Sequence, residues 1–217
     1  MASGGSTGAR ATRAGAALIA VGVVQFSAAM AIVQSAYPGY SDVTNYISDL
    51  GNTATSPWHV VFNVSIVLLG LLAFVGILLA WGGFPAGGSR VVGLVLLLAA
   101  SVGAVFVGLF PENVNGTVHG LASLTVFGPG GVALLVLAAG MSDRTSWHWL
   151  RWGSAVLGAI TLVSLAYYVP TQTGNTTWDP GFVERLIVFP ILIWGFLAAL
   201  HLARTPRAAL GPVASRA

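Results

Sequence analysis

Six long apolar runs constrain this chain more than any other feature of its sequence. Each run has about 20 residues, the length that a helix needs to cross the hydrocarbon core of a bilayer. The runs cover residues 14–36, 58–80, 91–110, 118–140, 152–169 and 182–203. Only 7% of the residues are charged, against about 25% in soluble domains. The sequence therefore predicts an integral membrane protein.

The apolar runs have to be helical, because a segment inside lipid must satisfy its own backbone hydrogen bonds. Turn signals such as Tyr37-Pro38-Gly39 separate them. We predict an all-α membrane protein, a bundle of six transmembrane helices over residues 14–203. The polar, basic segments 1–13 and 204–217 are expected to be disordered tails or arms on the membrane surface. Pro129 and its neighbouring glycines predict a kink in the fourth helix.

The arginines predict the orientation of the bundle. All nine basic residues are Arg, and with both termini on one side eight of them lie there. The remaining one, Arg185, lies on the other side. The positive-inside rule then places both termini in the cytoplasm of a multi-pass protein of the cell membrane. The alternative is that the first run is a signal peptide cleaved near Ala29-Met30-Ala31, but its apolar stretch is long for a signal core.

The first outer loop, residues 37–57, predicts a short helix at the membrane surface. An apolar stripe recurs there at helical spacing, made of Val43, Tyr46, Ile47 and Leu50. Ser41 is a candidate N-cap, and Asp42 would lie in the first turn, where the helix dipole favours an anion. Gly51 is a candidate stop. Asp49 would lie near the C-terminal end of this helix, where the dipole disfavours an anion, so capping does not explain it.

Ionisable residues gather where the predicted helices begin on the outer side. Such groups are costly at membrane depth and usually face the interior of a bundle with a partner. We therefore expect one outward cavity that contains Asp49, His59, His119, Glu184 and Arg185. Each residue also has a structural explanation, such as interfacial anchoring for His59 or an ion pair between Glu184 and Arg185. Because no HExxH or HxxxH spacing occurs, we expect neither a metal nor a cofactor.

Three short motifs resemble the DUF998 family of prokaryotic integral membrane proteins, a domain of unknown function. They are YISDLG at residues 46–51, GLFP at 108–111 followed by His119-Gly120, and GFVERL at 181–186. The resemblance implies that one polar site is formed by Ser48, Asp49, His119, Glu184 and Arg185. The first motif is more distantly similar to the DRAM/Sfk-like six-helix membrane proteins, which are tied to lipid organisation and autophagy.

Three functions fit these residues. In the leading hypothesis the outer cavity binds a lipid or another amphiphile, with Arg185 on an anionic head group that Asp49, His119 and Glu184 position. The rival is a lipid hydrolase or acyltransferase, with His119 as base, Asp49 or Glu184 orienting it, and Ser48 or water as nucleophile. The third is a structural subunit of a membrane assembly. We expect binding rather than catalysis.

Charge and composition narrow the partners. The net charge of +3 comes from scattered arginines without a basic patch, so nucleic acid is not an expected partner. The charges lie at helix ends rather than near the midplane, which argues against an ion-coupled pump. Membrane lipid is the expected partner, and a homo-oligomer or a membrane-protein partner stays open.

Overall fold

The computed structural model describes residues 3–141, 146–171 and 179–204. In these residues there is no strand, and six helices are long and apolar enough to cross a membrane. The prediction of an all-α membrane protein with six spanning helices is confirmed. The elements are α1 (Ser3–Ala36), η1 (Ser48–Gly51), α2 (His59–Ala80), η2 (Trp81–Gly83), α3 (Gly88–Leu109), α4 (Gly116–Gly140), α5 (His148–Thr171) and α6 (Pro180–Arg204).

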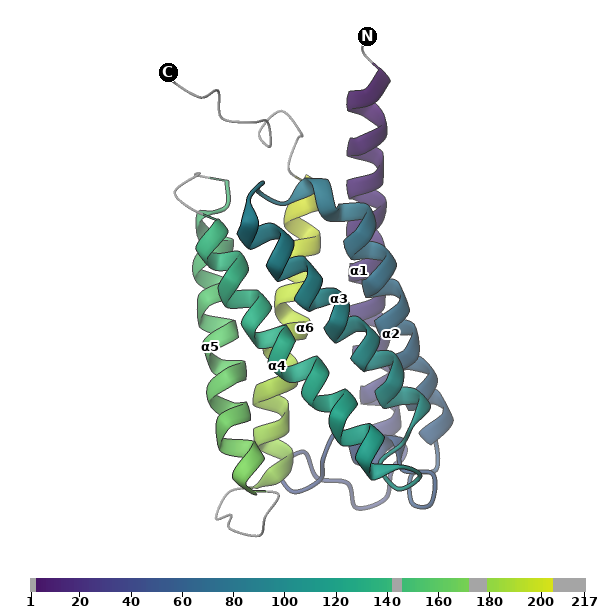
Figure 1. The fold of residues 1–217 in the computed structure, drawn as a ribbon. Helices are drawn as coiled ribbons and strands as arrows, with labels where there is room; N and C mark the ends of the chain where they lie inside the picture. The colour runs from purple at the N-terminus through teal and green to yellow at the C-terminus, as the bar shows by residue number, and fades with distance from the viewer. Residues whose placement is uncertain (1–2, 142–145, 172–178, 205–217) are drawn as a thin grey trace.

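The helices form a closed ring in chain order (Figure 1). Each helix packs on the next, and α6 returns to pack on α1. The start of α1 and the end of α6 lie at one end of the bundle, which we call the terminal end. The opposite, distal end carries the loops after α1 and α3. Large apolar side chains cover the outside, such as Val163 at 71% exposure, as a surface surrounded by lipid requires.

The helix boundaries lie close to the predicted ones except at the N-terminus. α1 begins at Ser3 rather than at Ala14, so residues expected to be a tail extend the helix. This segment contains Ala9 and Ala11, and alanine is the best helix former. A helix of 34 residues is about 51 Å long, so α1 projects beyond the bundle at the terminal end (Figure 1). The predicted C-terminal tail lies outside the described residues.

α4 is helical from Gly116 to Gly140, with Pro129 inside the helix. Glycines next to this proline allow α5 to approach closely. A Cβ at Gly131 would lie 2.8 Å from Leu162, and one at Gly158 would lie 3.0 Å from the carbonyl oxygen of Gly131. The glycine-rich segment therefore serves as a close helix crossing, as small residues do in membrane bundles.

The first loop does not form the single helix predicted over Ser41–Leu50. It has one turn followed by the short 3-10 helix η1. Polar side chains take backbone amides there: Asn45 Oδ1 accepts from Ser41 N–H at 3.1 Å, and Asp49 Oδ2 accepts from Tyr46 N–H at 2.9 Å. Such bonds compete with helical hydrogen bonds. The apolar periodicity therefore predicted a longer helix than the loop forms.

The same loop closes the distal end of the bundle with apolar side chains. Ile47 and Leu50 are 4% and 0% exposed, as their place in the predicted stripe suggested. They pack with Phe26, Val33 and Phe62 from α1 and α2. Burying each of the two loop side chains contributes about 1.5–3 kcal/mol, which fixes the loop over the helix ends.

Candidate functional site

A cavity of about 150 Å³ lies inside the bundle. Its wall comes from α1, α2, α3, α4 and α6, whereas the lining contains no described residue of α5. Most of the lining side chains are Ile, Val, Leu, Phe and Ala. The lining reaches from Glu184 to Ala198 along α6, a span of about 21 Å at the helical rise per residue. The cavity is therefore elongated along the bundle axis.

Three of the predicted site residues converge on the distal part of this cavity. Ser48 reaches it from the first loop, His119 from the first turn of α4, and Glu184 from the first turn of α6. Ser123, one turn deeper on α4, also lines it. The cavity is thus apolar along most of its length and polar where the loop covers it.

His119 has a defined orientation. It is 8% exposed, and its Nδ1 lies 3.0 Å from the carbonyl oxygen of Phe110. Because a carbonyl oxygen only accepts, Nδ1 carries the proton in this hydrogen bond. In the neutral ring Nε2 is then an acceptor. Asn115 caps the same helix by accepting from Val118 N–H, which holds the first turn of α4 in place.

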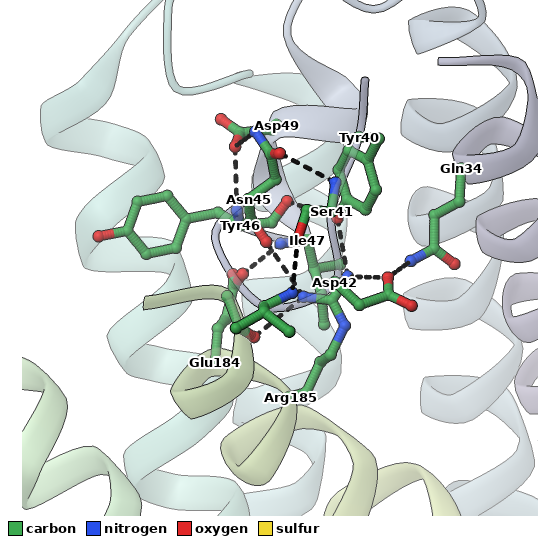
Figure 2. Close-up of polar contacts among 12 residues, drawn as sticks. Gln34, Tyr40, Ser41, Asp42, Asn45, Tyr46, Ile47, Asp49, Glu184 and Arg185 are labelled. Atoms are coloured by element: carbon green, nitrogen blue, oxygen red, sulfur yellow. Dashed lines mark hydrogen bonds and ion pairs between the residues drawn. The ribbon is translucent and has the colours of Figure 1, made fainter. Parts of the chain in front are cut away.

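Glu184 is the most deeply placed acid of the distal end. It is 6% exposed and accepts a hydrogen bond from Ile47 N–H in the first loop (Figure 2). One carboxylate oxygen, Oε2, makes this bond. In the described part of the chain no donor is hydrogen-bonded to the other oxygen, Oε1. Glu184 therefore joins the cavity to the loop above it.

Arg185 points away from the cavity and into the first loop. Its Nη1 donates to the carbonyl oxygens of Asn45 and Gly181, at 3.1 and 2.9 Å. Its Nη2 donates to Tyr40 Oη at 2.8 Å and to Asp42 Oδ1 at 2.7 Å (Figure 2). The side chain is only 8% exposed, whereas that of Asp42 is 66% exposed. Arg185 therefore fastens the loop to α6.

Tyr40 completes this fastening. Its hydroxyl accepts from Arg185 and donates to the carbonyl oxygen of Tyr46 at 2.8 Å. The guanidinium also lies 5.7 Å from the centre of the Tyr40 ring, within cation–π range. Burial raises the pKa of Tyr40 to about 12, so the phenol remains a neutral donor at physiological pH.

Asp49 and Ser48 stabilise the loop in different ways. Asp49 accepts from Tyr46 N–H and from Asn45 Nδ2, the latter at 3.2 Å, and it does not line the cavity. Ser48 donates to Glu112 in the second distal loop at 3.2 Å. No hydrogen bond joins His119 to Ser48, Asp49 or Glu184 within the described ranges.

His59 lies apart from the other predicted site residues. Its Nδ1 lies 2.9 Å from the carbonyl oxygen of Ser56 at the start of α2, and the residue does not line the cavity. Across residues 3–141, 146–171 and 179–204 no three His, Asp or Glu side chains come close enough to hold a metal ion.

Sequence reasoning missed the residues that hold Arg185. Tyr40 is separated from it by 145 positions, and no periodicity or spacing connects the two. Asp42, expected in the first turn of a helix, instead forms an ion pair with Arg185 and accepts from Gln34 (Figure 2). The GFVERL motif at residues 181–186 indicated that the start of this helix belongs to the site. It did not identify the residues that bind Arg185.

Comparison with known proteins identifies a family but no individual relative. No curated protein and no solved structure shows a match to the chain. One family model does match, described as a protein of unknown function (DUF998), and it covers residues 8–201. This range contains all six spanning helices except the first residues of α1 and the last of α6. The chain therefore belongs to the DUF998 family of proteins of unknown function.

Proposed function

We propose that this membrane protein binds the apolar chain of an amphiphile in its interhelical cavity, with the polar group of the ligand at the distal end. The observation that carries this proposal is the pairing of an elongated apolar wall with His119, Glu184 and Ser48 at one end. Ligand sites are mostly apolar with a few placed polar groups that orient the ligand.

The chemistry of the wall favours an apolar occupant over water. Cavities of this size that are lined by Leu, Ile and Phe side chains remain dry and take up small apolar molecules. A volume of about 150 Å³ is too small for the two chains of a phospholipid. The proposed occupant is therefore a single slender chain.

Two features favour binding over catalysis. The hydroxyl of Ser48 donates to Glu112 instead of to His119, so the proposed nucleophile is not hydrogen-bonded to the proposed base. His119 in turn is held by the Phe110 carbonyl. A lipid hydrolase would need the base within about 2.6–3.2 Å of the proton that it removes. Lipid turnover that is lost in His119→Ala would replace the binding proposal with the enzymatic one.

The proposal includes an orientation in the cell membrane. Arg10, Arg13, Arg90 and Arg151 lie at the terminal end, in the first turns of their helices or on the projecting part of α1. Arg185 is at the distal end and pairs with Asp42. This distribution supports cytoplasmic termini, which would place the polar part of the cavity in the outer leaflet.

Trp194 provides a direct test, because it lines the cavity below the polar end. It lies about 15 Å from Glu184 along α6 at the helical rise per residue. We would titrate the purified protein with 8-bromo-1-octanol, whose bromine quenches tryptophan on contact. We expect saturable quenching that is absent from Trp194→Phe, which removes only the cavity tryptophan. Equal quenching of the two proteins would contradict the proposal.

A filled cavity gives the matched control. Ala104 lines the cavity on α3, whereas Ala159 is exposed on the outside of α5. Both changes, Ala104→Leu and Ala159→Leu, add the same three carbons. We expect the first to reduce the Trp194-dependent quenching at least tenfold in affinity and the second to leave it unchanged. An unaffected Ala104→Leu protein would show that the probe binds elsewhere.

A further inference from the structure

We infer that the ligand of this cavity has a head group that donates hydrogen bonds and carries no negative charge, such as a hydroxyl or a protonated amine. The inference rests on the proposed function and specifies the chemical class of its ligand. It reverses the expectation from the sequence, in which Arg185 would receive an anionic head group.

The cation of the distal end is not directed at the cavity. Arg185 does not line the cavity, and its two terminal nitrogens make four hydrogen bonds to the first loop and to the start of α6. Two of these go to backbone carbonyl oxygens and one to the carboxylate of Asp42. An anionic head group would have to displace these bonds to reach the guanidinium.

The acid beside it, Glu184, is the charged residue that lines the cavity. Only 6% of its surface is exposed. Ile47 N–H satisfies Oε2, while Oε1 has no hydrogen-bonded donor in the described part of the protein. An oxygen of a carboxylate that lines the cavity and has no protein donor is free to accept a hydrogen bond, which a ligand hydroxyl or ammonium would donate.

The other polar groups of the distal end also present acceptors. With Nδ1 of His119 donating to Phe110, Nε2 of the neutral ring offers a lone pair. With the proton of Ser48 directed at Glu112, the Ser48 oxygen retains lone pairs. Ser123 adds a hydroxyl that can donate or accept. A carboxylate or phosphate, which only accepts, would meet acceptors and a like charge.

The experiment is a competition among three probes of equal chain length. 8-Bromo-1-octanol is first bound to the wild-type protein in detergent, and n-octanol, n-octylamine or octanoate is then added at pH 7. Displacement is measured as recovery of the Trp194-dependent fluorescence. We expect octanol and octylamine to displace the probe and octanoate to do so at least tenfold more weakly.

Glu184→Gln tests the assigned residue. The amide keeps an oxygen that can accept from Ile47 N–H and adds a donor toward the cavity, while it removes the charge. We expect the preference for octylamine over octanoate to fall at least tenfold. Thermal unfolding monitors whether this variant folds, and the wild-type competition remains decisive if it does not.

The outcomes separate the two claims. Octanoate that competes as well as octylamine in the wild-type protein would overturn the inference while the cavity remains a binding site. An unchanged preference in a folded Glu184→Gln protein would also overturn it. If 8-bromo-1-octanol gives no Trp194-dependent quenching at all, the proposed function fails, and with it the basis for the inference.

Discussion

At the scale of residues, Glu184 and Arg185 show how neighbours in a sequence acquire different roles. Adjacent positions on a helix do not face each other. Glu184 lines the cavity, whereas Arg185 reaches the first loop, and no salt bridge between them is present in the described residues. The alternative considered from the sequence, an ion pair between these two neighbours, is not found there, and Arg185 instead pairs with Asp42. Helix geometry therefore separates the acid that lines the cavity from the cation that holds the first loop.

Arg185→Lys should destabilise the protein although it preserves the charge. An ammonium group lacks the planar fork that reaches Tyr40, Asp42 and two carbonyl oxygens together. We expect a loss of about 2 kcal/mol, the value of a hydrogen bond to a charged group. Thermal unfolding in detergent measures it. Arg10→Lys, at an exposed position of α1, is the control and should be neutral.

Two glycines of α6 should respond in opposite directions to alanine. A Cβ at Gly181 would overlap with the carbonyl oxygen of Asn45, while one at Gly195 would make ordinary contacts at 3.6 and 3.9 Å. Gly181→Ala should cost about 1–3 kcal/mol through overpacking. Gly195→Ala should stabilise the helix by about 0.5–1 kcal/mol. A stable Gly181→Ala protein would mean that the loop does not press on α6.

At the scale of elements, the first loop contacts most other parts of the distal end. It contacts α6 through Arg185 and Glu184, and α2 through Asn63, which donates to the Gly51 carbonyl at 3.0 Å. It contacts the second distal loop through Asn113, whose side chain bonds to Thr53. Because Ile47 and Ser48 also line the cavity, the loop is the roof of the proposed binding site.

Asp49→Ala should loosen this roof. The carboxylate accepts from Tyr46 N–H in the manner of a cap, and losing a cap costs about 1 kcal/mol. Amide hydrogen exchange over residues 44–51 should accelerate, while exchange within α2 stays unchanged. Asp49→Asn retains an accepting oxygen and is the matched control. Equal exchange rates in the two variants would show that the Tyr46 hydrogen bond does not order the loop.

The helices were predictable from the sequence, whereas the loop was only partly so. Spans of about 20 apolar residues leave a chain in lipid no alternative to a helix. The loop has the same local periodicity as a helix, but Asn45 and Asp49 bind backbone amides there instead. Likewise, the sequence predicted that His119 and Glu184 share a site, and both line the cavity, but the direction of Arg185 depends on Tyr40, 145 positions away.

At the scale of the whole molecule, the orientation in the membrane can be tested cleanly, because the chain has no cysteine. Thr55 is exposed at the distal end, and Ala86 is exposed in the connection between α2 and α3 at the terminal end. In intact cells a membrane-impermeant maleimide should label Thr55→Cys and not Ala86→Cys. Both should react after permeabilisation. The reverse pattern would place the termini outside.

Because α6 packs on α1, the chain could connect the same six helices in a different order. Both helices reach the same end of the bundle, and the connection between α2 and α3 lies at that end as well. A linker joining Arg204 to the start of α1, with new ends opened next to Gly87, would give a circular permutant in which every helix keeps its neighbours and its direction across the bilayer. The helices of the bundle therefore follow one another in a cyclic order, in which α6 and α1 pack together without a connection between them in the chain.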